Sequence, residues 1–284
     1  MMIGSAANWQ SQGETDCKTM CLVFIAYQIE GCPPVMIGAN REESRRRPVT
    51  SPVCCRVRSL RCLLAGADHG PDGSFPQMGT WLGVNEAGIA VAVTNRNDGE
   101  LPYAAQTRSK GLLAVDLLGF DDPARAAQYA REQLTGGGFG GCNYLIAGAD
   151  LALVVQAPGA ARVSVTELSL GIHAMTNLDL DDANDARIRV VAENLQLRDF
   201  PGSARRICRD DRIVIPGADR GTISSSVLLV DATIALDHVQ GVDRHDRYWR
   251  CPIVLDEPIM LDHVLGDPRD LAYQRYAFPD QPGT

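Results

Sequence analysis

The sequence lacks the features that would assign it to several large classes of protein. No stretch of about 18 apolar residues occurs, so a membrane span is not expected. Basic residues number 27 against 35 acidic ones, and the resulting net charge of −8 argues against a nucleic-acid partner. There is no C-x-x-C pair and no H-E-x-x-H sequence, the common zinc-binding patterns, so no metal is expected.

Motifs for cofactors and for serine hydrolases are also missing. Gly136, Gly138 and Gly141 satisfy G-x-G-x-x-G, but they follow an expected helix and precede an expected strand, the reverse of the order in dinucleotide-binding folds. No G-x-S-x-G sequence supports a Ser-His-Asp triad. We therefore expect a protein that works without a cofactor.

A secretion signal and a disulfide framework are not expected either. Residues 1–20 include Glu14, Asp16 and Lys18 and lack the apolar run of about 7 to 15 residues that a signal peptide requires. The nine cysteines are spread through 284 residues, a chain long enough to bury a core without cross-links. We interpret the cysteines as mostly reduced and the protein as cytoplasmic.

What the sequence does contain is a series of short apolar runs separated by turn residues, which is typical of antiparallel strands. The expected strands are 22–27, 35–39, 53–57, 62–65, 81–84 and 89–93, then 143–147, 151–156, 162–168 and 172–176, and a last hairpin of 226–231 and 234–239. Helical spacing and capping residues predict helices at 109–118, 122–134 and 184–198. Residues 201–216 are expected to be irregular.

Two blocks of antiparallel strands separated by helices favour the α+β class, with two packed sheets and helices outside them. No repeat or long linker divides the chain, so we expect one domain at 21–249. The proline-containing segment 250–284 is expected to be an extension that wraps this domain. Residues 1–20 are interpreted as a removable leader or as a start assigned too early.

Cys21 occupies a position that suits a nucleophile. It follows Met20 directly and opens the first strand, after a polar stretch that no core requires. If the mature chain begins at Cys21, the thiol is the nucleophile and the free α-amino group, with a reference pKa of about 7.7 to 8.0, is its base. The alternative is an ordinary buried cysteine at the start of a strand.

Blocks along the chain carry a family resemblance. Met20-Cys21-Leu22-Val23-Phe24, Ala39-Asn40-Arg41-Glu42-Glu43 and Arg47-Pro48 resemble the opening of the NRDE (transport and Golgi organisation 2 protein-like) family. Later blocks follow in family order: Gly79 to Asn85, Thr94 to Arg96, Ser109 to Gly111, Asn143 to Ile146 and Ser224 to Val227. The resemblance implies an N-terminal nucleophile hydrolase-like fold, a four-layer αββα sandwich of two stacked antiparallel sheets between helices.

A more distant similarity, to bile-salt and penicillin V amidases, implies roles for individual residues. Arg41 matches an arginine beside the nucleophile, where a cation favours the thiolate. Asn95 and Asn177 resemble the two positions of an oxyanion hole, although asparagines at strand ends also serve turns. The remaining candidates are substrate-binding or structural residues: Asn40, Glu42, Glu43 and Trp81.

Two positions depart from the family pattern. Glu42 stands where the family tetrapeptide has aspartate, which lengthens the side chain and keeps its charge. Ile223 precedes Ser224 where relatives commonly place an arginine, so a second cation is missing there. The cluster Arg45-Arg46-Arg47 is either a solvated turn or a contact for an anionic substrate group.

The expected function is a cofactor-independent cysteine hydrolase or acyltransferase that acts on a small-molecule amide, at a carbon–nitrogen bond other than a peptide bond. The alternative is a non-catalytic carrier or trafficking protein for haem or a lipid-like ligand, in which the segment Asn40 to Glu43 is a structural turn and Arg41 pairs with carboxylates or a propionate. A third possibility is an interaction protein with a vestigial site. These readings rest on analogy of fold.

Overall fold

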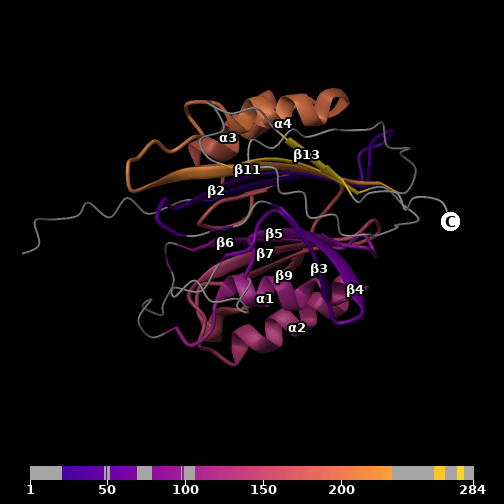
Figure 1. Cartoon of the computed structure of the whole chain (residues 1–284), viewed down its shortest axis with the longest axis vertical. Coiled ribbons are helices and arrows are strands. Elements are labelled where there is room, and N and C mark those ends of the chain that lie inside the picture. Colours follow the sequence, from indigo (N-terminus) through magenta and orange to yellow (C-terminus); the bar gives the residue numbers. More distant parts are fainter. Residues whose placement is uncertain are drawn as a thin grey trace, which may run out of the picture.

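A computed structural model describes residues 21–47, 49, 52–68, 79–96, 98 and 106–231, together with the backbone of 259–265 and 274–277. Two antiparallel sheets stack face to face, and each outer face carries a pair of helices (Figure 1). The architecture is therefore an α+β sandwich with four layers, as the sequence predicted.

One sheet has six strands and contains the segment around Cys21. Its order is β10-β1-β2-β11-β12-β13. The strands are β1 (Leu22–Tyr27), β2 (Val35–Ser44), β10 (Gly171–Met175), β11 (Arg220–Val230), β12 (Ile259–Leu265) and β13 (Gln274–Ala277). Both faces of this sheet are covered, which explains why β1 is a continuous buried run of six residues with no polar alternation.

The second sheet follows the chain order with one interruption by helices. Its seven strands run β3-β4-β5-β6-β7-β8-β9, each pairing antiparallel with the next. They are β3 (Val53–Val57), β4 (Leu60–Leu64), β5 (Leu82–Asn85), β6 (Ala90–Asn95), β7 (Cys142–Ala147), β8 (Ala152–Ala157) and β9 (Ser164–Glu167). The meander predicted from the turn residues is confirmed.

Each helix pair belongs to one sheet. Helices α1 (Lys110–Leu117) and α2 (Pro123–Thr135) cover the seven-stranded sheet, and α3 (Ala186–Asn194) and α4 (Phe200–Cys208) cover the other (Figure 1). The predicted caps are present, because Ser109 accepts from the Gly111 amide and Asp122 from the Arg125 amide. None of the described helices is both long and apolar enough to cross a bilayer.

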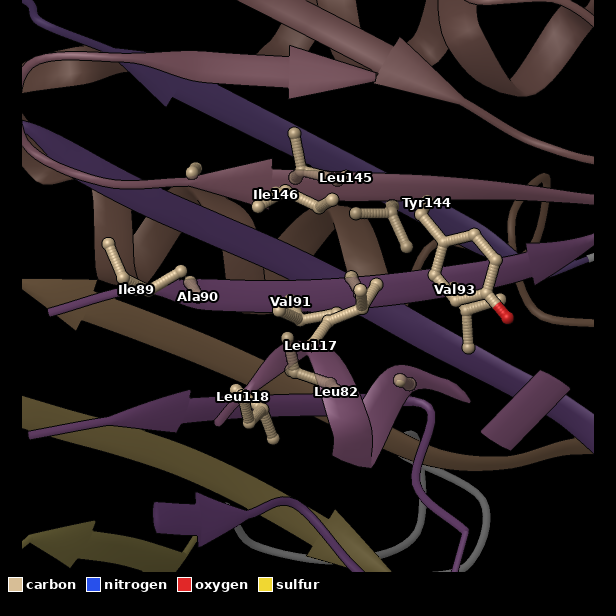
Figure 2. Packing of buried hydrophobic residues seen from close by; sticks show 14 of the residues in the cluster. Leu82, Ile89, Ala90, Val91, Val93, Leu117, Leu118, Tyr144, Leu145 and Ile146 are labelled. Carbon is tan, nitrogen blue, oxygen red and sulfur yellow. The ribbon is translucent and has the colours of Figure 1, made fainter. Parts of the chain in front are cut away.

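Two separate hydrophobic cores hold the layers together. The larger lies between the sheets and continues under α1 and α2, and Figure 2 shows part of it, with Leu82, Val91, Leu117 and Tyr144 in close packing. The smaller joins the outer face of the six-stranded sheet to α3 and α4. Alternate residues of β1 therefore enter different cores: Val23 and Ile25 face the other sheet, whereas Leu22 and Phe24 face the helices.

Three expectations differ from the structure. Residues 201–216 were expected to be irregular, but α4 begins at Phe200 because Pro201 fits the first helical turn, and Ala204 and Ile207 bury an apolar face. The helix expected to reach 198 ends at Asn194. Strands β12 and β13 lie in the segment that was expected only to wrap the surface. β12 pairs with β11, the position that the predicted hairpin assigned to residues 234–239. Residues 234–239 lie outside the described part of the chain.

Gly38 offers a test of the packing in the smaller core. Gly38 pairs with Phe24 across β1 and β2, and a Cβ added at Gly38 would overlap the Phe24 ring, which is fully buried beside Phe200. We expect Gly38→Ala to lower the free energy of unfolding by about 1 to 3 kcal/mol, measured by urea unfolding. In a Phe24→Leu background the same substitution is expected to cost much less. An equal cost in both backgrounds would contradict this account.

Candidate functional site

The candidate nucleophile lies in a row of polar residues that crosses four strands. β1 pairs with β2 through Leu22 and Asn40, so continuing the register by one residue places Cys21 opposite Arg41. On the other side, β10 ends at Met175, which pairs with Val23, and Asn177 follows two residues later in a bend at the same end of β1 as Cys21.

The fourth residue of this row is Ser224, which pairs directly with Arg41 across β2 and β11. Directly opposed residues point to the same face of a sheet. The row Cys21–Arg41–Ser224 therefore faces the interior between the two sheets, Asn177 lies at its end, and all four residues are buried. The structure thus brings together three of the four predicted catalytic residues, Cys21, Arg41 and Asn177.

The tetrapeptide Asn40 to Glu43 is part of strand β2, so the reading of it as a structural turn is wrong. Because strand side chains alternate, Arg41 and Glu43 face the other sheet, whereas Asn40 and Glu42 face α3 and α4. The motif therefore divides into two pairs with different surroundings.

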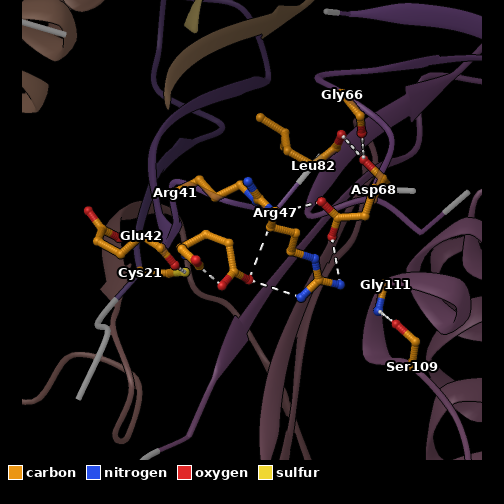
Figure 3. A network of polar contacts seen from close by, with 12 residues as sticks. Cys21, Arg41, Glu42, Arg47, Gly66, Asp68, Leu82, Ser109 and Gly111 are labelled. Atoms are coloured by element: carbon orange, nitrogen blue, oxygen red, sulfur yellow. Dashed lines mark hydrogen bonds and ion pairs between the residues drawn. The ribbon is translucent and has the colours of Figure 1, made fainter. Parts of the chain in front are cut away.

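Arg41 is the centre of a buried ionic network (Figure 3). Only 4% of it is exposed, and its Nη2 lies 2.6 Å from Asp68 Oδ1 and 3.8 Å from Glu43 Oε2. Arg47 contacts the same two carboxylates: its Nη1 lies 3.0 Å from Glu43 Oε2, and its Nη2 lies 3.2 Å from Asp68 Oδ2. The Trp81 ring covers the guanidinium, with Cζ 4.2 Å from the ring centroid.

The surroundings of Cys21 keep its side chain protonated in this state of the chain. Burial raises the pKa of the thiol to about 12, the Glu42 carboxyl also raises it, and Arg41 opposes the shift. The nearest acceptor to Sγ is the Glu42 carbonyl oxygen at 3.9 Å (Figure 3). A thiol in this condition is a weak nucleophile, since the thiolate is the reactive form.

Asn40 and Glu42 connect the sheet to its helices. Asn40 Nδ2 donates to the Cys208 carbonyl at 2.9 Å, at the end of α4, and Ser225 Oγ donates to Asn40 Oδ1. Glu42 Oε1 accepts from Thr222 Oγ1 at 2.9 Å, and burial raises the pKa of Glu42 to about 8. These contacts join β2 to α4 and to β11.

The two predicted oxyanion-hole residues come from different sheets. Asn95 ends β6 and is half-buried, while Asn177 follows β10 and is fully buried. The residues that precede them in sequence are hydrogen-bonded to each other: Thr94 Oγ1 donates to the Thr176 carbonyl at 2.6 Å. Thr176 Oγ1 in turn donates to Asp185 Oδ2 at 2.7 Å, which ties the Asn177 segment to the cap of α3.

Lys110 is a site residue that the sequence reasoning did not select. Gly79 and Gly111 let two backbone segments touch, since Thr80 N donates to the Gly111 carbonyl at 3.0 Å, and a Cβ on Gly111 would lie 3.1 Å from Gly79 Cα. This contact places the start of α1 beside the site. Burial there lowers the pKa of Lys110, whereas the nearby thiols of Cys142 and Cys21 raise it.

The signal for Lys110 was present in the sequence, because the blocks containing Gly79 and Ser109-Lys110-Gly111 were both recognised. The order of these blocks along the sequence does not show that they touch in space.

Ile223 is the extra residue of a β-bulge in β11, between the pairs Glu42–Thr222 and Arg41–Ser224.

The described residues contain one Ser-His-Asp group, formed by Ser169, His173 and Asp181. His173 Nδ1 lies 2.7 Å from Asp181 Oδ2, and Nε2 lies 3.4 Å from Ser169 Oγ. However, Nε2 is closer to the Ser169 carbonyl oxygen, at 2.9 Å, so this nitrogen donates a proton and is unavailable as a base. The group is an ion pair on β10, and it does not form a catalytic triad.

The described part of the chain contains no set of three or more His, Cys, Asp or Glu side chains arranged to hold a metal ion. Cys21, Cys32, Cys62 and Cys142 are present as thiols. Arg45 and Arg46 lie in an exposed turn, whereas Arg47 joins the Arg41 network.

Comparison with known proteins gives one family and a fold. The family model described as Transport and Golgi organisation 2 matches residues 20–199. No curated protein sequence matches the chain.

Among solved structures, the Caenorhabditis elegans ortholog of N-acylethanolamine-hydrolyzing acid amidase is similar, with a TM-score of 0.54 and 16% identity over 74% of this chain and 92% of that one. Conjugated bile acid hydrolase from Clostridium perfringens matches in a mutant form, with a TM-score of 0.42 and 12% identity over 83% and 94% of the two chains. At 16% identity, the likeness to the acid amidase ortholog shows the fold alone, that of the N-terminal nucleophile hydrolases.

Removal of the carboxylate that bridges Arg41 and Arg47 tests the ionic network. We expect Asp68→Asn to lower the free energy of unfolding by about 2 kcal/mol, because a buried guanidinium loses its closest counter-charge. The matched control is Asp219→Asn, whose partner Arg46 is 84% exposed, and this change is expected to cost under about 1 kcal/mol. Equal urea midpoints for the two variants would contradict the account.

The His173–Asp181 pair predicts a dependence of stability on pH. The hydrogen bond to Asp181 raises the pKa of His173 above its ordinary 6.5, so the pair stabilises the fold fully below that pH and less as pH rises through the higher, folded-state value. We expect His173→Gln to reduce the free energy of unfolding more at pH 6 than at pH 9, by less than about 1 kcal/mol because Asp181 is 44% exposed and solvent screens the pair. Ser169→Ala, which keeps the ion pair, should show no such difference; a pH-independent effect of His173→Gln would refute the assignment.

Proposed function

The chain belongs to the Transport and Golgi organisation 2 family, and from this premise and the geometry at Cys21 we propose that it is an amide hydrolase or acyltransferase whose nucleophile is an N-terminal Cys21. The observations that support the proposal are the pairs Leu22–Asn40 and Val23–Met175, because Cys21 precedes the first strand directly and these pairs bring it to the ends of the strands that lead to Arg41 and Asn177. A similar fold belongs to a protein named as hydrolysing N-acylethanolamines, which are amides.

The proposed reaction begins when residues before Cys21 are absent. The new α-amino group accepts the proton of Sγ, and the thiolate attacks the carbonyl carbon of a small amide. Asn177 stabilises the oxyanion of the tetrahedral intermediate, whereas the Asn95 side chain, next to the inward-facing Thr94 on β6, points to the other face of its sheet. The protonated amine then gives its proton to the leaving nitrogen, and the carbon–nitrogen bond breaks to leave a thioester on Cys21.

The second half of the reaction releases the acyl group. Water attacks the thioester carbonyl and loses a proton to the α-amino group, which yields a carboxylic acid and restores the thiol. If an amine attacks in place of water, the product is a new amide and the reaction is acyl transfer. No metal or redox cofactor is needed to balance either route.

Arg41 has two roles in this proposal. Its positive charge lowers the pKa of Cys21, against the larger effect of burial. Its contacts with Asp68 and Trp81 hold the guanidinium in one place, so the charge is fixed before substrate binds. Glu43, bound to Arg41 and Arg47, shares in this positioning.

The experiment compares the full chain with one whose first residue is Cys21. We expect the shortened chain to hydrolyse small N-acyl amides and to carry an acyl adduct on Cys21 by mass spectrometry, whereas the full chain and Cys21→Ala are inactive. Cys62→Ala is the matched thiol control and should retain activity. Asn177→Ala should lower kcat by about 10² to 10³-fold.

The N-terminus of the protein purified from its natural source decides whether the mechanism operates. A mature chain in which Cys21 remains internal would exclude the α-amino group as base. Saturable haem binding, read as a Soret shift, together with no turnover by the shortened chain, would replace the proposal by the carrier function.

A further inference from the structure

The site contains buried donors that no described residue satisfies. Arg41 Nη2 is bound to carboxylates, but Nη1 is buried and makes no hydrogen bond with the described part of the chain. Ser224, directly opposite Arg41 on β11, is 0% exposed, and its Oγ likewise has no partner among the described residues. Such orphaned groups are rare in native proteins because each costs free energy.

The surroundings carry an excess of positive charge. Arg41, Arg47 and Lys110 contribute three cations on this side of the sheet, while Asp68 and Glu43 contribute two carboxylates. This local excess occurs in a protein whose net charge is −8. A general basic character of the chain therefore does not explain it.

Lys110 contributes the third cation of this region. Its ammonium forms no ion pair with a described residue, and its charge is influenced by Cys21, Arg47 and Glu43. Burial lowers its pKa, so a negative charge placed near it would be favoured. The backbone contact between Gly79 and Gly111 holds the start of α1 in this position.

From these groups we infer that the proposed substrate carries an anionic group, a carboxylate near the scissile amide, which Arg41 Nη1, Ser224 Oγ and Lys110 Nζ bind beside Cys21. This inference rests on the proposed function and names its substrate class. A guanidinium edge matches a carboxylate well, and the hydroxyl and ammonium supply the remaining donors. An N-acyl amino acid has this arrangement, with its carboxylate one carbon from the amide nitrogen.

The geometry of the row supports this orientation of the substrate. Arg41 lies between Cys21 and Ser224, with neighbouring strands about 4.7 to 4.9 Å apart. A ligand whose carbonyl carbon is at Cys21 therefore reaches the unsatisfied donors within a few bonds. A neutral amide substrate would leave the same donors without partners. We therefore expect the site to bind an N-acyl amino acid more tightly than its neutral amide analogue.

The test measures binding without turnover. N-hexanoylglycine, N-hexanoyltaurine and N-hexanoylglycinamide are titrated into the Cys21→Ala protein, both as the full chain and as a chain beginning at position 21, by isothermal calorimetry. We expect the carboxylate probe to bind at least about tenfold more tightly than the neutral amide. Tighter binding of the taurine conjugate would overturn the carboxylate assignment, and equal binding of the neutral probe would overturn the anionic subsite.

Matched variants locate the subsite. We expect Lys110→Met and Ser224→Ala each to raise the Kd of N-hexanoylglycine by about tenfold with little effect on N-hexanoylglycinamide, and Lys110→Arg to preserve the difference. Arg131→Met removes an exposed cation from α2 and is the control for net charge. Equal losses of affinity for N-hexanoylglycine and N-hexanoylglycinamide, or no binding of any probe, would refute the inference. Urea unfolding of each variant checks that it is folded.

The outcomes distinguish this inference from the proposed function. Selective binding of the acid without turnover by the Cys21-first enzyme would retain the subsite and reject the hydrolase. Turnover of neutral amides with no preference for acids would retain the hydrolase and reject the subsite.

Discussion

The burial of one guanidinium constrains most of the site. A charge removed from water requires counter-charges and hydrogen bonds close by. Arg41 meets this requirement through Asp68, which precedes β5, and through Glu43 on its own strand, while Trp81 covers it from the second sheet. The ion pair therefore links β2 of one sheet to the segment before β5 of the other, close to the end of β1 where Cys21 lies.

The sequence predicted the layers and most strands, because apolar runs and turn residues are local signals. The caps Ser109 and Asp122 were readable for the same reason. Helix α4 was not predicted, because the segment 201–216 is charged and contains prolines, although Pro201 occupies the first turn of the helix. Strands β12 and β13 lie in a proline-containing segment, and the pairing of β12 with β11 depends on contacts far apart in sequence.

The site was only partly predictable, for a related reason. Cys21, Arg41 and Asn177 were selected by family motifs, and strand pairing brings them to the same end of β1. Asp68 carries no distinctive local pattern, and Ser224 belongs to a family block that assigns it no role, so only their pairing with Arg41 in space identifies them. The alternation of faces along β2, which separates Arg41 from Glu42, also required knowing that the motif is a strand.

The strand order of the six-stranded sheet has a consequence for biosynthesis. Cys21 and Arg41 leave the ribosome early, but β10 and β11, which flank β1 and β2, are made long afterwards. At about 5 to 20 residues per second, the delay is on the order of ten seconds or more. If the residues before Cys21 are removed, a peptidase that trims the nascent chain would meet β1 with only β2 beside it, whereas self-cleavage that uses Asn177 or Ser224 must wait until that residue has emerged. The timing of such processing would therefore report which agent performs it.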